Sequence, residues 1–410
     1  MGRINKPVQF VTDANDNIIG FEGFEGALIP LVASTPSSSA NNPGLVLAPL
    51  NTIANIGKFD MVSNFARSRA KKARVAAGLG TMKTAVLGDS TEAAIYALGT
   101  ADPTTGVKKF SPCSRMAALV NSTIYPANSD SAWCDNNSGA VQTYDPRVFF
   151  NSGVTSSTTI RSIAGWVTTT ATNPLYFTPR NFADTVDLYY IDNNATFNLS
   201  RVGDVTGPLV NGGNTGAVMK ATLTFSTRTV TAAFSAKPAS GTLLIVGIVC
   251  YDSTKPCVQF FNWGWSGGAA ADWANTTNLY SVANAVVAVA PDLTFFTPGI
   301  NDWSNNTGVP AFEANIDLVV KRLLISGDVV LSTSVPSQNS AYPLANQKLY
   351  VDAIIRVAAA NPGVMLNDSW GRWHTWEEQN DFGFYTNNLH PNVAGYYEKG
   401  QGYARIFESI

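Results

Sequence analysis

The pattern of apolar and polar residues divides the chain into unlike parts. Around residues 80–100, and again after residue 262, short apolar runs alternate with longer segments of helical periodicity. Between 148 and 261 short alternating runs are separated by turn clusters such as Asn211-Gly212-Gly213-Asn214. Strands that alternate with helices are typical of a parallel sheet, whereas short, regularly spaced strands are typical of a β-sandwich. We therefore predict an α/β domain with a parallel sheet, interrupted by an inserted β-sandwich.

The same pattern predicts individual elements and domain limits. An apolar run at 84–87 is expected to be a strand, followed by a helix at 91–98. Further expected elements are strands at 292–297, 329–331 and 364–366, and helices at 59–75, 312–324, 344–360 and 393–406. The predicted modules are an N-terminal arm at 1–55, an α/β domain in two parts at 56–147 and 262–410, and a β-sandwich at 148–261.

Three short polar blocks lie at the ends of predicted strands or close to the C-terminus. They are Gly88-Asp89-Ser90, Gly299-Ile300-Asn301-Asp302 and Leu389-His390-Pro391-Asn392. In an open parallel sheet the reactive site lies beyond the carboxyl ends of the strands, where these blocks would meet. The chain has only 2 histidines, so His390 is the leading general base for a nucleophilic Ser90.

These blocks, in this order, resemble those of the SGNH hydrolases of the GDSL esterase superfamily. The resemblance implies a flavodoxin-like three-layer fold, with Ser90 as nucleophile and His390 as base. It also implies an oxyanion hole formed by the N–H groups of Ser90 and Gly267 and the side-chain amide of Asn301. Gly264 is the alternative to Gly267 for the glycine of that hole.

One position departs from the family pattern. The residue three places before the histidine is usually an acid, and here it is Asn387. An amide oxygen can hold the histidine tautomer but stabilises an imidazolium less than a carboxylate does. The alternatives are a Ser90–His390 dyad helped by Asn387, an acid supplied by Asp381 or Asp368, and an inactive fold that only binds its ligand.

Aromatic residues next to the blocks are candidates for substrate binding. Trp265, Trp303 and Trp373 are the three we single out, because aromatic rings suit the C–H faces of sugars. For the tryptophan-rich segment 370–376 the alternative is a packed loop under the sheet edge.

The layout of the modules narrows the expected substrate. A strand-rich insert after the serine block resembles carbohydrate O-acetylesterases that act on peptidoglycan or polysaccharide, and residues 10–20 resemble linkers of bacteriophage tail proteins. We expect an esterase that deacetylates a bacterial surface polysaccharide, carried on a phage tail in the virion, as a homotrimer. The alternatives are a lipase or thioesterase of the same fold and a receptor-binding protein that holds glycan without cleaving it.

The composition of the chain mainly argues against certain partners and sites. Only 14% of the residues are charged and the net charge is -2, which gives no reason to expect a nucleic-acid partner. The sequence as given shows no apolar run long enough for a membrane span, no secretory signal, no metal-ligand spacing and no cofactor motif. The 4 cysteines permit two disulfides, Cys113 with Cys134 and Cys250 with Cys257, and the latter pair resembles the closed tip of a hairpin. Buried free thiols are the alternative.

Overall fold

The computed structural model describes residues 10–12, 18–22, 28–30, 65–99, 106–121, 125–133, 141–150, 154–156, 166–168, 174–204, 206–338 and 344–410. The chain forms two compact units, Met1–Pro49 and Leu50–Ile410. In the first, β1 (Phe10–Thr12), β2 (Ile18–Glu22) and β3 (Leu28–Pro30) form an antiparallel sheet. Residues 13–17, within the segment compared with phage tail linkers, lie outside the described residues.

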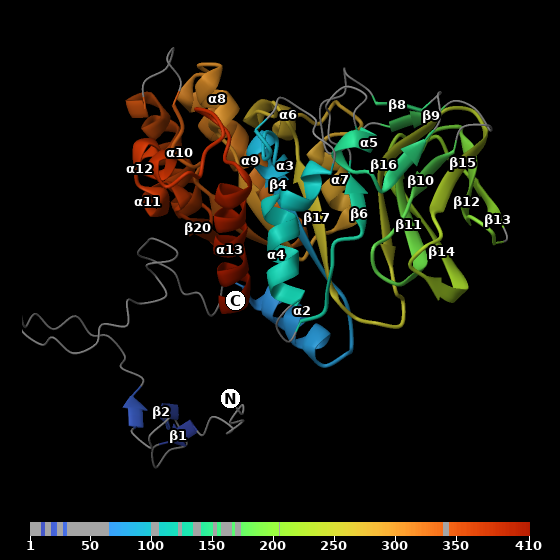
Figure 1. Ribbon diagram of the computed structural model, residues 1–410, viewed down its shortest axis with the longest axis horizontal. Coiled ribbons are helices and arrows are strands. Elements are labelled where there is room, and N and C mark those ends of the chain that lie inside the picture. Colours follow the sequence, from blue (N-terminus) through green and yellow to red (C-terminus); the bar gives the residue numbers. More distant parts are fainter. Residues whose placement is uncertain are drawn as a thin grey trace, which may run out of the picture. The chain divides into compact units, whose positions relative to one another are not determined.

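A six-stranded parallel sheet organises the larger unit (Figure 1). Its strands, in spatial order, are β20 (Val364–Asn367), β19 (Asp328–Ser332), β18 (Leu293–Thr297), β4 (Met82–Gly88), β17 (Val258–Gly264) and β5 (Ala127–Asn128). The predicted strands at 84–87, 292–297, 329–331 and 364–366 all lie in this sheet. β4 is buried along almost its whole length, which explains why it reads as a continuous apolar run.

Helices cover both faces of the sheet (Figure 1). Successive strand residues point to opposite faces, so Val86 packs in one apolar cluster and Leu87 in the other. The helices that contribute to the Val86 cluster are α2 (Ala66–Ala76), α4 (Pro112–Asn121) and α13 (Val393–Ser409). Those that contribute to the Leu87 cluster include α7 (Val282–Val289), α9 (Val309–Ser326) and α10 (Leu344–Ala360). This is the three-layer α/β arrangement that the sequence predicts.

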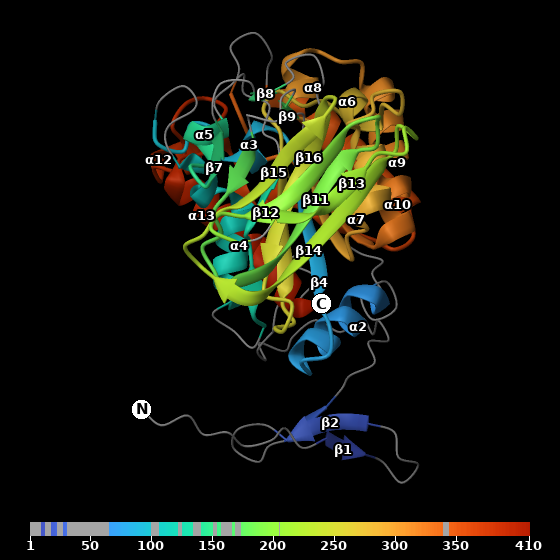
Figure 2. The same ribbon diagram turned by 90° about the vertical axis from the view of Figure 1, so that its right-hand side faces the viewer.

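The inserted module is a β-sandwich of two antiparallel sheets (Figure 2). One sheet contains β13 (Thr206–Asn211), β12 (Thr196–Arg201), β15 (Phe234–Ser240), β10 (Leu175–Phe177) and β7 (Val148–Phe150). The other contains β14 (Val218–Thr229), β11 (Ala183–Ile191), β16 (Leu243–Tyr251), β9 (Trp166–Thr168) and β8 (Val154–Ser156), with β6 (Ser131–Trp133) paired to β16. The strand β17, which the predicted limit at 261 divides, belongs entirely to the parallel sheet.

Trp133 joins the sandwich to the α/β domain. It stands in β6, and its ring lies 5.2 Å from the ring of Phe261 and 5.6 Å from that of Trp263, both in β17. Gly247 of β16 leaves the space for it, since a Cβ there would come within 2.3 Å of the indole. The two modules therefore share one continuous apolar core.

One local expectation is wrong, and one alternative left open by the sequence is decided. The helix after Ser90 is short: α3 spans Ser90–Ala93, and Ala94 takes a left-handed φ of 65° that ends it. Cys250 and Cys257 are free and buried; Cys250 lies in the sandwich strand β16, whereas Cys257 leads into the parallel sheet. Cys113 is free as well, and Cys134 lies outside the described residues.

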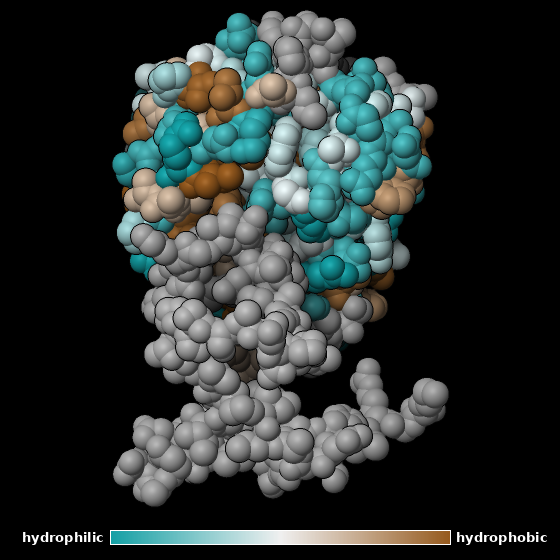
Figure 3. Space-filling view, turned by 90° about the vertical axis from the view of Figure 1, so that its left-hand side faces the viewer, coloured by the Kyte–Doolittle hydropathy of each residue, from teal (hydrophilic) through white to brown (hydrophobic). Residues whose placement is uncertain are grey.

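The surface formed by the C-terminal helices is mainly hydrophilic, with separate apolar groups between the polar ones (Figure 3). Among the described residues, no helix combines the length and apolar character that a membrane crossing requires. The described residues also contain no cluster of three or more His, Cys, Asp or Glu side chains suited to a metal ion.

Candidate active site

The three polar blocks converge because neighbouring strands end in the same row. In the sheet register Gly88 at the end of β4 lies between Gly264 of β17 and Thr297 of β18. The segments that follow these three residues therefore leave the sheet at the same edge. They carry Ser90, Gly267 and Asn301, and the site is built from residues that are far apart in sequence.

Ser90 begins α3 directly after β4. Asp89 caps this short helix, and its Oδ1 accepts the backbone N–H of Thr91 at 2.8 Å. Gly88 allows the tight turn, since a Cβ there would lie 2.4 Å from the Glu92 side chain and 2.8 Å from the Thr297 carbonyl oxygen. The turn places Ser90 at the sheet edge, where only 3% of its surface is exposed.

His390 reaches Ser90 from the segment before α13. Its Nε2 lies 2.9 Å from Ser90 Oγ, within hydrogen-bonding distance. The ring of Tyr96 lies 4.5 Å from the imidazole, measured between centroids, and helps to bury it. Burial disfavours the charged imidazolium and lowers the pKa of His390 to about 4. His390 is therefore neutral at pH 7, which is the form that can accept the serine proton.

Asn387 orients this histidine. Its Oδ1 accepts the backbone N–H groups of Leu389 at 2.8 Å and His390 at 2.7 Å, and lies 3.3 Å from His390 Nδ1. An amide oxygen can only accept, so the contact favours the tautomer with the proton on Nδ1. That tautomer leaves Nε2 free to accept a hydrogen bond from Ser90 Oγ.

Asp368 and Asp381, the two acids considered as alternatives to Asn387, do not take its place beside His390. Asp368 caps α11 (Ser369–Trp373), where its side chain accepts the N–H of Gly371 at 2.9 Å. Asp381 is exposed at the end of α12 (Trp376–Asp381). Burial is the cause of the lowered pKa of His390, and among the described residues no carboxylate opposes that shift. Of these three residues, Asn387 is thus the one that contacts the His390 ring in the structure.

Gly267 and Asn301 lie on adjoining segments beside the serine turn. Asn301, on α8 (Ile300–Ser304), donates from Nδ2 to the carbonyl oxygen of Gly268 at 2.9 Å. Gly267 is exposed, has a φ of 78°, and would leave a Cβ with no atom within 4 Å. Gly264 is buried instead, and a Cβ on it would meet the Ala93 backbone nitrogen at 2.3 Å. Gly267 is therefore better placed than Gly264 to face a ligand.

Two buried carboxyl groups flank this region. The pKa of Asp302 is raised to about 7, mainly by burial; a hydrogen bond from the Ala270 N–H opposes the shift, and the charge of Asp89 contributes to it. Burial likewise raises the pKa of Asp89 to about 6, against the nearby positive charge of Lys399. These acids hold the surrounding backbone, and neither replaces Asn387 beside His390.

A buried ion pair lies next to the turn that carries Ser90. Lys399 Nζ lies 2.5 Å from Glu92 Oε1, and both side chains are fully buried. Lys399 also donates to Thr91 Oγ1 at 3.0 Å, and the Tyr403 hydroxyl donates to Glu92 Oε1 at 2.9 Å. The pair links α13, which follows the histidine block, to the residues directly after Ser90.

The three tryptophans singled out from the sequence do not face a ligand. Trp265, Trp303 and Trp373 are each 1% exposed and pack in the apolar core. The Nε1 hydrogen of Trp373 is donated to Glu398, at 2.6 Å. The expectation that they bind substrate is corrected, because a fully buried indole has no free ring face to offer.

Sequence reasoning misses Tyr96 and Lys399. The sequence pattern places Tyr96 within a helix, and only the left-handed turn after α3 brings its ring onto His390. Lys399 lies in an expected helix, but nothing local marks it as buried. The charged residue Glu92, two places after the serine, is the one signal that a buried partner is needed.

No protein-family model matches the chain, and no curated protein matches it in sequence. Among solved structures, the chain is similar to a peptidoglycan O-acetylesterase at 15% identity and a TM-score of 0.64, covering 84% of this chain and 95% of the other. It is also similar to a family two carbohydrate esterase from Clostridium thermocellum, at 11% identity and a TM-score of 0.29, covering 64% of this chain and 98% of the other. The first likeness is one of fold, and it confirms the α/β fold with a parallel sheet that the sequence predicts.

Proposed function

We propose that the protein is a serine esterase that removes acetyl groups from a carbohydrate. The observation that carries the proposal is the 2.9 Å contact between Ser90 Oγ and His390 Nε2, with Asn387 Oδ1 behind the imidazole. A nucleophile, a neutral base and a group that orients the base are the parts that acyl transfer requires.

In the proposed reaction His390 Nε2 takes the Ser90 proton as Oγ attacks the ester carbonyl carbon. The carbonyl oxygen of the resulting tetrahedral intermediate carries the negative charge. The N–H groups of Ser90 and Gly267 and the Asn301 amide would donate to it; Asn301 Nδ2 has a second hydrogen besides the one held by Gly268. The imidazolium then protonates the leaving sugar oxygen, which leaves an acyl group on Ser90. Water, activated by the same histidine, releases acetate.

Two observations on the fold as a whole support a carbohydrate substrate. The fold neighbour with a TM-score of 0.64 is a peptidoglycan O-acetylesterase. The inserted β-sandwich resembles a carbohydrate-binding module in its layout. An acetylated bacterial surface polysaccharide is therefore the substrate class we propose, with a phage tail as the proposed setting.

A second function is favoured by one observation, the amide of Asn387 in the place of an acid. Without a carboxylate the imidazolium is less stabilised, which suits a protein that binds acetylated glycan without cleaving it.

Hydrolysis of p-nitrophenyl acetate, butyrate and octanoate by the wild type and by Ser90→Ala tests the proposal. Ser240→Ala, which changes an exposed serine at the end of β15, is the matched control. We expect activity on the acetate ester, little on octanoate, and loss of the activity only in Ser90→Ala. Activity that survives Ser90→Ala, or no activity on any ester, would refute the esterase. Glycan binding by such an inactive wild type would favour the second function.

A further inference from the structure

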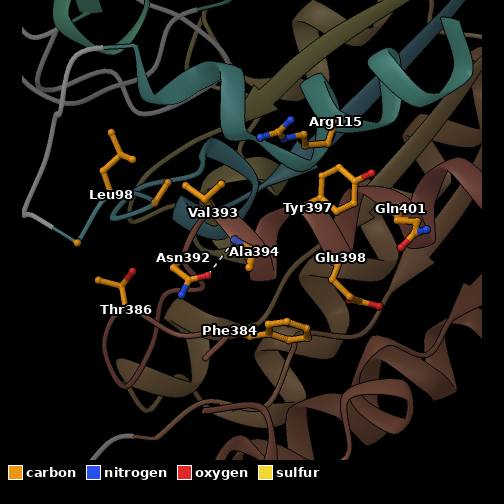
Figure 4. Close-up of a pocket in the computed structure, with 12 residues that line it drawn as sticks. Leu98, Arg115, Phe384, Thr386, Asn392, Val393, Ala394, Tyr397, Glu398 and Gln401 are labelled. Carbon is orange, nitrogen blue, oxygen red and sulfur yellow. Dashed lines mark hydrogen bonds between the residues drawn. The ribbon is translucent and has the colours of Figure 1, made fainter. Parts of the chain in front are cut away.

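A cavity that neither Ser90 nor His390 lines lies next to the catalytic histidine. Its volume is about 980 Å³, and it is bounded by the chain after α3, by α4, and by the segment from 384 into α13 (Figure 4). Arg115 comes from α4, whereas Tyr397 and Gln401 come from α13. Neither the proposed reaction nor the proposed oxyanion hole uses any of these residues.

One layer of chain separates this cavity from the imidazole. Thr386 lines the cavity and donates from Oγ1 to the carbonyl oxygen of Tyr96 at 2.9 Å. The Tyr96 ring in turn lies 4.5 Å from the ring of His390. On the same wall, the Val393 N–H donates to the Ala97 carbonyl oxygen at 3.1 Å. Thr386 and Tyr96 thus connect the wall of the cavity to the imidazole of His390.

Arg115 gives the cavity a positive charge that is not neutralised within the described residues. Its guanidinium carbon lies 5.3 Å from the Tyr397 ring and 5.5 Å from the Phe110 ring, which hold it by cation–π contact. Among the residues that the structure describes, no carboxylate lies within ion-pair distance of it, and its buried Nε has no hydrogen-bond partner. In Figure 4 the guanidinium extends along the edge of the cavity.

The carboxylate that lines the cavity is already satisfied. Glu398 Oε1 accepts from Arg372 Nη1, and Oε2 accepts from Trp373 Nε1, each at 2.6 Å. Glu398 therefore neutralises Arg372 rather than Arg115. The cavity as a whole favours an anion, and a planar guanidinium matches a carboxylate best of all.

The other lining groups suit a sugar ring. Tyr397 is 41% exposed and Leu98 47% exposed, which leaves apolar surface for the C–H face of a pyranose. The amide of Gln401 projects from α13 at the cavity, where it can bond hydroxyl groups (Figure 4). Exposed aromatic surface is thus found at this cavity, and not at the tryptophans chosen from the sequence.

We propose that this cavity binds a sugar residue that carries a carboxylate, next to the acetylated residue of the same glycan. The inference rests on the proposed function for its biological meaning, and it makes the substrate an acidic polysaccharide. The carboxylate can belong to a uronic acid or to the lactyl group of N-acetylmuramic acid, since both place one anion on a pyranose.

Calorimetric binding to the Ser90→Ala protein tests the inference without turnover. The probes are trigalacturonate beside its methyl ester, and the N-acetylglucosamine–N-acetylmuramic acid disaccharide beside chitobiose. We expect at least one acidic probe to bind on the order of tenfold more tightly than its neutral counterpart, and the preferred acid identifies the source. Adding Arg115→Gln should remove this preference. Arg405→Gln, an exposed arginine on the same α13 that carries Tyr397, should keep it.

Two results would overturn the inference: neither acid binding better than its neutral counterpart, or a preference that survives Arg115→Gln in a protein with unchanged thermal stability. The proposed function fails separately, through the absence of serine-dependent ester hydrolysis by the wild type. Acid-selective, Arg115-dependent binding by a protein with no esterase activity would support the cavity and refute the enzyme.

Discussion

Asn387 contacts His390 twice through a single atom: its Oδ1 accepts the histidine backbone N–H at 2.7 Å and lies 3.3 Å from Nδ1 of the ring. The arrangement holds both the position and the tautomer of the base, but it supplies no charge.

An Asn387→Asp variant should therefore be a better esterase at neutral pH. A carboxylate oxygen can accept the same three hydrogen bonds, and its charge should raise the pKa of His390 by about 1–3 units and stabilise the imidazolium. We expect kcat at pH 7 to rise on the order of tenfold with p-nitrophenyl acetate, since one pKa unit corresponds to about 1.4 kcal/mol. An Asp variant no faster than the wild type would show that the missing charge does not limit the reaction.

The wild-type pH profile should extend far into the acid range. Burial lowers the pKa of His390 to about 4, so the base stays neutral until the pH approaches that value. We expect kcat/KM to be nearly constant from pH 7 down to about pH 5 and to decrease at lower pH. The reason is that kcat/KM reports the ionisation of the free enzyme. In Asn387→Asp the same fall should begin at higher pH. A wild-type profile that drops at pH 6.5 would indicate an imidazole open to water.

Asn301→Ala tests the proposed oxyanion hole. Loss of one such donor typically lowers kcat about 10²- to 10³-fold, with little effect on KM. Asn305→Ala is the matched control, since Asn305 is an exposed asparagine directly after the same short helix. If kcat falls equally in the two variants, the cause is damage to α8 and not the loss of a hydrogen-bond donor.

Removing Lys399 should destabilise the whole α/β domain. Lys399→Met leaves Glu92 buried without its partner, and breaking a buried pair in this way costs about 3–5 kcal/mol of unfolding free energy. The double variant Lys399→Met with Glu92→Gln should recover much of the loss, because no uncompensated charge remains. Urea unfolding followed by fluorescence measures both. A double variant as unstable as the single one would show that packing, and not charge, dominates.

Asp302→Asn should change how stability depends on pH. The raised pKa of about 7 means that the folded protein keeps Asp302 protonated where the unfolded chain has ionised it. The resulting stabilisation is complete below pH 3.8 and is lost as the pH rises to about 7. Relative to Asp302→Asn, the wild type should therefore lose unfolding free energy between pH 4 and pH 7. If the difference in unfolding free energy between the two proteins does not change with pH, the pKa of the Asp302 carboxyl is not raised in the folded protein.

Features that depend on the local pattern of residues can be predicted from the sequence. The alternation of strands and helices identifies the parallel sheet, and the polar blocks after β4 and β18 identify Ser90 and Asn301, because residues that follow parallel strands meet at one edge. Asn387 is found by its spacing from His390.

Tertiary packing decides what the sequence does not show. Trp265, Trp303 and Trp373 have the same sequence signature whether they face solvent or core, and the structure buries all three. Cys250 and Cys257 are close in sequence, yet their strands belong to different sheets. The turn that brings Tyr96 over His390 contradicts a helical pattern and exists only because the surrounding chain holds it.

The β-sandwich enters and leaves the α/β domain through adjacent strands. β5 precedes it and β17 follows it, and the two pair in parallel from Ala127 opposite Val258. The Asn128 side chain also donates to the Cys250 carbonyl oxygen at 2.9 Å, across the two connections. Besides this neck, the contacts of Trp133 with Phe261 and Trp263 tie the sandwich to β17, the neighbour of the strand that leads to Ser90. A sandwich of another size could therefore replace this one only if it kept the paired neck and these aromatic contacts.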